Sequence, residues 1–181
     1  MSTRDRTNNT TEVGLLDALL DAYQGEVFGV AMYRRVTESL DDPWQRWQWE
    51  CLTRVEVELR DELAAALLRL GHTAIPDEEE HDAGLAEAER IVGLPWLEML
   101  HEFTCDLPPL VERYSAIAVD HESAVDVVGC REVLDRLVRH EVASIEFHRG
   151  ELAGRAPIDS IGPVVDLLTG PIPDPPIERA S

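Results

Sequence analysis

Four glutamates stand at positions where the apolar stripe of a helix requires a hydrophobic residue, and they constrain the fold more than any other feature. They form two matching pairs, because Glu56 follows Glu26 by 30 residues and Glu141 follows Glu112 by 29. An ionised carboxylate in an apolar core is costly unless it is paired or bound to a metal. The pattern therefore predicts two similar helical hairpins whose carboxylates meet at a metal site in the core of a four-helix bundle.

The apolar residues recur at helical spacing, and neither an alternating strand pattern nor an Asn-Gly hairpin signal occurs, so we expect an all-α fold. Asp42 suits the N-cap of the second helix, Pro43 suits its first position, and Gly71 and Gly129 mark turns. The pattern predicts long helices over residues 12–40, 43–70, 108–128 and 131–153. Short helices over residues 85–92 and 95–105 are expected in a long crossover between the two hairpins.

These elements divide the chain into three parts. Residues 1–10 are polar and are expected to form a disordered arm. Residues 11–155 are expected to form the bundle. Residues 156–181 are rich in proline, which favours an extended tail that is either disordered or lies against the bundle or a partner.

The charge balance limits the partners. The chain carries 16 basic and 36 acidic residues, a formal net charge of −20, and an acidic surface repels the phosphates of nucleic acids. No apolar run is long enough to span a membrane, and the first ten residues lack the features of a signal peptide. The three cysteines (Cys51, Cys105 and Cys130) have neither disulfide-framework nor zinc-site spacing. We therefore expect a cytoplasmic protein that binds no nucleic acid.

The two hairpins also align with each other as a weak internal repeat. The segment Glu26–Tyr33 falls on Glu112–Val119, and Arg54–Glu58 falls on Arg139–Ala143. The second-helix glutamate of each hairpin has leucine or isoleucine about one turn away on both sides, which places it on an inward face. A chance match in a glutamate-rich chain is the alternative explanation of the alignment.

The run Tyr23–Tyr33 resembles the first-helix motif of the demethoxyubiquinone hydroxylases, within the wider ferritin-like and rubrerythrin group. The resemblance covers roughly residues 12–153 and is strongest in the first helix. It implies a ferritin-like antiparallel four-helix bundle with one long crossover. In that group, a glutamate from each helix and two Glu-x-x-His motifs hold two irons. The irons activate dioxygen for hydroxylation or desaturation, or oxidise ferrous iron.

This chain departs from the group at both expected histidines, because Leu59 and Ser144 occupy those positions. The ligand set that the resemblance implies is therefore reduced to four carboxylates. Carboxylates favour hard divalent ions, so three alternatives remain for the cofactor: two irons, another divalent metal, or none. The four are Glu26, Glu56, Glu112 and Glu141. His148, two turns beyond Glu141 on the same face, is a further candidate ligand, as is His121. The alternative role for both histidines is polar support around the site.

Two other groups of residues offer weaker signals. Glu98, His101 and Cys105 share a predicted crossover helix, and Glu78-x-x-His81 lies in an acidic segment, but both patterns arise easily by chance. Trp44, Trp47 and Trp49, with Trp96, predict either core packing, a dimer surface or an aromatic wall for a ligand.

Three functions compete at this point. In the first, a dimetal oxidase or hydroxylase acts on a small molecule that enters past Phe28 and Met32, and Tyr33 is a redox-active or hydrogen-bonding group beside the metals. In the second, the domain holds no metal, and Leu59 and Ser144 open a pocket for a small apolar ligand or leave a scaffold for a partner. In the third, the chain is a ferroxidase or iron store in an assembly, for which the tail is a docking peptide. A homo-oligomer is expected.

Overall fold

The structure is a computed structural model that describes residues 3–122 and 130–176. Within these ranges every regular element is a helix, which confirms the expected all-α class. The helices are α1 (Thr3–Ser39), α2 (Pro43–Arg69), α3 (Glu78–Ile91), α4 (Trp96–Asp120), α6 (Arg131–Leu152) and α7 (Pro157–Val165). Gly129, which was expected to mark a turn, lies outside the described residues.

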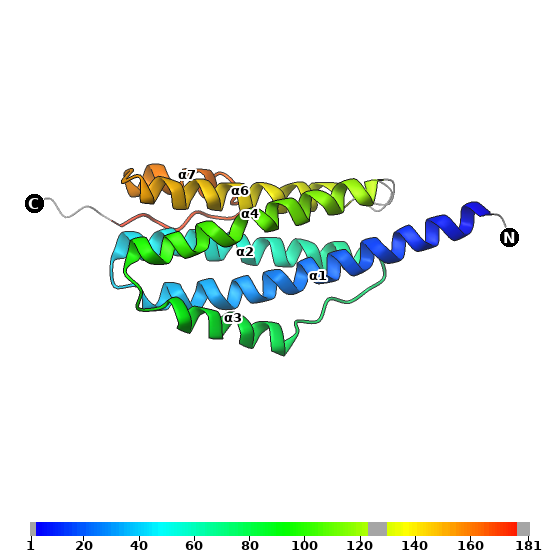
Figure 1. Ribbon diagram of the computed structural model, residues 1–181, viewed down its shortest axis with the longest axis horizontal. Coiled ribbons are helices and arrows are strands. Elements are labelled where there is room, and N and C mark those ends of the chain that lie inside the picture. Colours follow the sequence, from blue (N-terminus) through cyan, green and yellow to red (C-terminus); the bar gives the residue numbers. More distant parts are fainter. Residues whose placement is uncertain (1–2, 123–129, 177–181) are drawn as a thin grey trace, which may run out of the picture.

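The helices form two antiparallel pairs, α1 with α2 and α4 with α6, as Figure 1 shows. Helix α3 packs on the outer side of α1, and α7 packs against α6 and α2. The close approach of α3 to α1 depends on Gly84, because a Cβ atom there would lie 2.4 Å from the backbone oxygen of Phe28. The inner faces of the helices enclose one hydrophobic core.

The ends of α2 follow the local rules that its sequence suggests. The side chain of Asp42 accepts hydrogen bonds from the backbone N–H groups of Trp44 (2.9 Å) and Gln45 (3.0 Å), and Pro43 begins the helix, so both predictions are confirmed. At the other end Gly71 has a φ of 80°, and His72 N–H donates to the carbonyl oxygen of Leu67 at 3.0 Å. This is the Schellman arrangement, and its left-handed residue favours glycine.

Several boundaries differ from those expected, among them the end of α4, which lies at Asp120 and not near residue 128. Helix α1 begins at Thr3 rather than after a disordered arm, because residues 3–12 contain no glycine or proline that would end it. Helix α3 begins at Glu78, where the N-cap Asp77 and three successive glutamates favour a helix start. Helix α4 continues through Pro108 and Pro109, which were expected to begin a separate helix. The prolines remove only two backbone donors, and the apolar residues on either side of them pack into the core.

The segment after α6 differs in part from the expected extended tail, because it begins with a helix, whereas its later residues are extended and lie against the bundle, which was one of the alternatives. Residues 157–165 form α7, and residues 166–176, which we call the C-terminal strap, run back along the bundle (Figure 1). The indole N–H of Trp47 donates to the carbonyl oxygen of Pro173 at 2.9 Å, which attaches the strap to α2.

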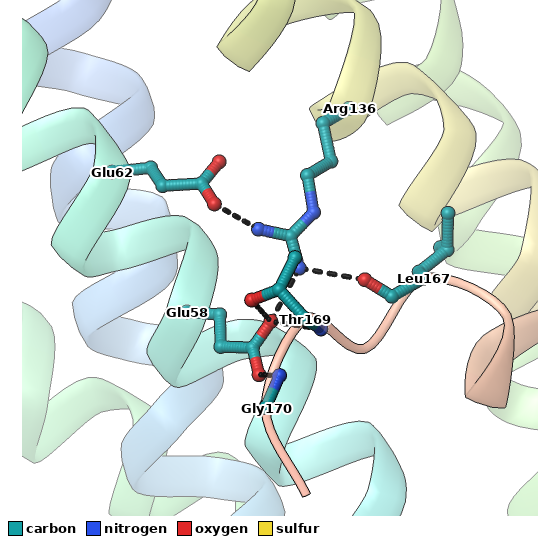
Figure 2. Close-up of polar contacts among 6 residues, drawn as sticks. All are labelled: Glu58, Glu62, Arg136, Leu167, Thr169 and Gly170. Atoms are coloured by element: carbon teal, nitrogen blue, oxygen red, sulfur yellow. Dashed lines mark hydrogen bonds and ion pairs between the residues drawn. The ribbon is translucent and has the colours of Figure 1, made fainter.

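A second attachment of the strap centres on Arg136, which is only 5% exposed (Figure 2). Its guanidinium contacts the carboxylates of Glu58 (2.5 Å) and Glu62 and donates to the carbonyl oxygen of Leu167 (2.8 Å). Glu58 also accepts hydrogen bonds from Thr169 and Gly170. Burial alone would raise the pKa of Glu58, but these hydrogen bonds together lower it. The strap is therefore held by charge-assisted bonds to α2 and α6.

The tryptophans pack mainly in the core. Trp49 is fully buried, and its ring centroid lies 5.0 Å from that of Tyr33 and 5.1 Å from that of Phe103. Trp47 is buried and makes an edge contact with Trp44. Among the described residues, no helix combines the length and the apolar character needed to cross a bilayer.

Candidate ligand cavity and its buried carboxylates

A cavity of about 630 Å³ opens between α1, α3 and α4 and reaches the centre of the bundle. Its walls are mostly apolar and its inner end is polar. The apolar and aromatic lining comes from Phe28, Met32, Tyr33, Ile91, Phe103, Leu107, Leu110 and Tyr114. The predicted entry residues Phe28 and Met32 therefore do line the cavity.

Three carboxyl groups from three helices form the inner end, which we call the floor of the cavity. Glu26 comes from α1, Glu56 from α2 and Glu141 from α6, and all three line the cavity. Their exposed fractions are only 2%, 6% and 5%, respectively. Three acidic groups in so buried a place require protons, cations or hydrogen-bond donors for compensation.

The protein supplies one imidazole for this purpose. The Nε2 atom of His140 lies 2.7 Å from Glu56 Oε1, and His140 is 1% exposed. The other oxygen of Glu56 faces α1, where Gly29 makes room for it. A Cβ atom at Gly29 would lie 2.4 Å from Glu56 Oε2. Glycine at this position therefore allows the carboxylate to fit between the helices.

The pKa values of all three carboxyl groups are raised, so these groups hold their protons to higher pH than exposed carboxyls do. Burial and the nearby Glu56 raise the pKa of Glu26 well above its ordinary value of 4.5, and a hydrogen bond between the two carboxyls favours the proton on Glu26. Burial also raises the pKa of Glu56 to about 8 and that of Glu141 to about 7. The Oε2 atom of Glu26 is buried without a hydrogen-bond partner among the described residues.

Two tyrosines complete the polar lining near the floor. Burial, together with the charges of the three glutamates, raises the pKa values of Tyr33 and Tyr114 well above 10. Both phenols therefore stay protonated and retain an O–H that donates hydrogen bonds. Tyr33, the candidate catalytic residue, packs against Trp49 and Phe103 and so has a fixed ring position.

One of the four predicted ligands is not part of this site. Glu112 is exposed on α4 and does not line the cavity. Tyr114, two residues further along, occupies the inward face instead. Two residues turn a helix by about 200°, so the two side chains lie on nearly opposite faces. The repeat thus aligned a surface glutamate with a core glutamate.

The other predicted residues also lie outside the cavity lining. Leu59 and Ser144 are fully buried in the bundle interior and do not line this cavity. His148 is fully buried against Phe103 and Phe147, with neither ring nitrogen hydrogen-bonded among the described residues. Burial and the charge of His140 lower its pKa to about 3, so His148 is neutral.

The weaker metal motifs form no cluster either. His101, Cys105 and His81 are all exposed on the outer surface. Across residues 3–122 and 130–176, no group of three or more His, Cys, Asp or Glu side chains is already in position to hold a metal ion.

Two polar residues near the floor of the cavity were not identified from the sequence. His140 immediately precedes Glu141 and lies three residues after Leu137, at the spacing of the α6 core stripe. Tyr114 likewise lies on the core face of α4. A search of each apolar stripe for every polar residue, rather than for glutamate alone, would have found both.

The mouth of the cavity carries charged residues of both signs with an acidic excess. The residues are Glu80, Glu87, Arg90, Glu102 and Arg113. Arg90 forms ion pairs with Glu87 (2.7 Å) and Glu102 (3.1 Å), and Arg113 pairs with Asp21. Both cations at the mouth are therefore already neutralised.

No family model, no curated protein and no solved structure matches this chain. The class that the fold and the site define is an all-α protein with a cavity that ends at buried carboxyl groups.

Proposed function

We propose that the chain is a ferritin-like helical bundle that binds a small, largely apolar molecule in its core, without a resident metal. The observation that carries this proposal is the cavity of about 630 Å³ that reaches three buried carboxyl groups. Its volume lies within the range of about 300–1,000 Å³ that is typical of small-molecule sites. Apolar walls with a few converging polar groups are also typical of such sites.

Protons balance the charge of the floor in this proposal. Glu26 shares a hydrogen bond with Glu56, and His140 contacts Glu56 from the other side. A protonated carboxyl in such a chain donates as well as accepts, so the floor is stable without a metal and can orient a polar group of the ligand. The two antiparallel helix pairs and the carboxylates on α1, α2 and α6 support the ferritin-like assignment.

A neutral apolar probe tests the ligand-binding role. Indole should bind to the EDTA-treated protein, as measured by saturation-transfer NMR, because the cavity walls are aromatic and aliphatic. Leu110→Trp fills the cavity from α4 and should abolish the signal. Val119→Trp is the matched control, because Val119 is 75% exposed on the same helix and does not line the cavity. Equal binding of indole to both variants would refute the proposal.

A metal-dependent oxidase or hydroxylase is the second candidate, and one observation favours it. The Oε2 atom of Glu26 is buried without a partner beside Glu56, Glu141 and His140, and these side chains are suitable donors for one divalent ion. They do not suit two ions, because Glu112 is exposed and Leu59 has no donor atom. A bound iron would supply dioxygen activation, and Tyr33 would be a hydrogen-bonding group beside it.

Metal analysis separates the two candidates. Protein produced with added iron is assayed for metal content, and its melting temperature is measured with and without EDTA. The metal-free proposal predicts almost no bound metal, no effect of EDTA, and no loss of stability in Glu26→Gln. Two results together would establish the metal candidate instead. The protein would contain about one ion per chain, and chelation would lower the melting temperature of the wild type but not that of Glu26→Gln. Glu112→Gln is the control for both outcomes.

A further inference from the structure

The floor of the cavity has an unused acceptor. Glu26 is 98% buried within the bundle, since its exposed fraction is 2%, and its Oε2 atom has no hydrogen-bond partner among the described residues. Glu141, also on the floor, has no hydrogen bond or ion pair to a basic side chain among those that the described residues form. A buried acceptor without a donor raises the free energy of the folded protein. A ligand that brings N–H donors to this oxygen therefore gains more binding free energy than a ligand without donors.

The charges around the cavity favour a positive ligand. The three carboxyl groups of the floor hold protons while the cavity is empty, and an ammonium that displaces these protons would supply the compensating positive charge beside His140, which contacts Glu56. At the mouth, Arg90 is occupied by Glu87 and Glu102, and Glu80 has no ion pair within the part of the chain that the structure describes. An acidic excess at the mouth of a cleft with low-dielectric walls concentrates ligands of positive charge. The formal charge of the whole chain, −20, acts in the same direction.

The walls suit an ammonium group as well as an apolar body. Tyr33, Phe103 and Tyr114 line the inner part of the cavity, and aromatic faces attract cations. Leu107, Leu110 and Ile91 also line the cavity and offer only apolar contact. The polar end and the apolar end of the cavity therefore match a molecule with one cationic head and a compact hydrophobic body.

We infer that the cavity selects small primary amines, with the ammonium at the carboxyls of Glu26, Glu56 and Glu141 and the apolar body between α1 and α4. This inference rests on the proposed ligand-binding role and adds to it the chemical class of the ligand. It excludes carboxylates, phosphates and other anions, which would meet the acidic excess at the mouth and would find carboxyl groups instead of cations at the floor. It also assigns a role to the acceptor that the protein itself leaves unpaired.

Three probes with one ring system and different charge test the inference. Tryptamine is cationic, tryptophol is its neutral alcohol, and indole-3-acetate is anionic. Isothermal titration calorimetry on the EDTA-treated full chain should give a Kd for tryptamine at least about tenfold lower than for tryptophol, and no binding of indole-3-acetate, because hydrogen bonds to charged groups are the stronger class. Glu26→Gln should weaken tryptamine binding at least about tenfold and tryptophol binding by much less, because the alcohol carries no charge.

The controls separate this inference from the function it rests on. Glu112→Gln, an exposed change, should bind all probes as the wild type does, and Glu141→Gln provides a second floor variant if Glu26→Gln does not fold. Equal affinities for tryptamine and tryptophol would overturn the amine inference while leaving the ligand cavity in place. Failure of every probe, including indole, would overturn both. Tight binding of indole-3-acetate would show that the floor is not acidic and would also overturn the inference.

Discussion

Replacement of Glu56 by glutamine should change how the stability of the protein depends on pH. Burial raises the pKa of Glu56 from its ordinary value of 4.5 to about 8. Between these values the folded chain holds a proton that the unfolded chain has lost, so the free energy of unfolding falls as pH rises through this window. Glutamine has the shape of the glutamate side chain and can keep the contact with His140, but it cannot ionise. The variant should therefore lack this decrease in the free energy of unfolding.

The magnitude follows from the pKa shift. One pKa unit corresponds to about 1.4 kcal/mol, so between about pH 5 and pH 8 the wild type should lose roughly 3 kcal/mol relative to Glu56→Gln. The variant also removes a like charge from beside Glu26 and Glu141, which acts in the same direction. Below about pH 4 the two proteins should differ little, because Glu56 is then largely neutral in the folded and unfolded states alike.

The assay is urea unfolding of EDTA-treated protein at a series of pH values, followed by circular dichroism. Glu112→Gln is the control, and its curve should parallel that of the wild type because Glu112 is exposed on α4. If Glu56→Gln shows the same pH dependence as the wild type, the carboxyl does not carry a raised pKa, and the reasoning from its burial is wrong.

Two further predictions concern packing around the site and the strap. Gly84→Ala should destabilise the protein by about 1–3 kcal/mol relative to Gly162→Ala, since its Cβ would meet the Phe28 backbone at 2.4 Å whereas that of Gly162 meets no atom within 4 Å. Equal thermal unfolding of the two variants would contradict the tight contact between α1 and α3. Arg136→Met should cost about 3–5 kcal/mol, because it leaves two carboxylates of α2 without their buried partner. Arg60→Met, which removes a surface pair with Asp61, should cost no more than about 1 kcal/mol in the same assay, and a similar loss in both would refute the role of the strap contacts.

The helical pairs were predictable because their signals are local. The cap at Asp42 and Pro43 and the left-handed Gly71 each depend on residues within one turn, and the sequence alone indicates them. The continuity of α4 was not predictable in this way. Two successive prolines favour a helix start, and only the packing of the flanking turns in the core keeps α4 unbroken.

Part of the site was also predictable, because its signal is local too. Glu26, Glu56 and Glu141 interrupt apolar stripes, and the structure places all three in the core beside one cavity. Glu112 was assigned by alignment with Glu26, yet the face that points inward on α4 depends on how α4 packs against α6. The contact between Glu56 and His140 joins residues 84 positions apart, so no local pattern reveals it.

The central claim is that three carboxyl groups share one buried site and hold protons there. A titration of the glutamate side-chain carboxyl carbons by ¹³C NMR, on EDTA-treated protein, tests it directly. At least two carboxyls should titrate above about pH 6, because burial raises the pKa of Glu56 to about 8 and that of Glu141 to about 7. One of these signals should vanish in Glu56→Gln, and all should persist in Glu112→Gln. If every glutamate titrates below about pH 5, as model carboxyls do, the three groups do not share a buried site.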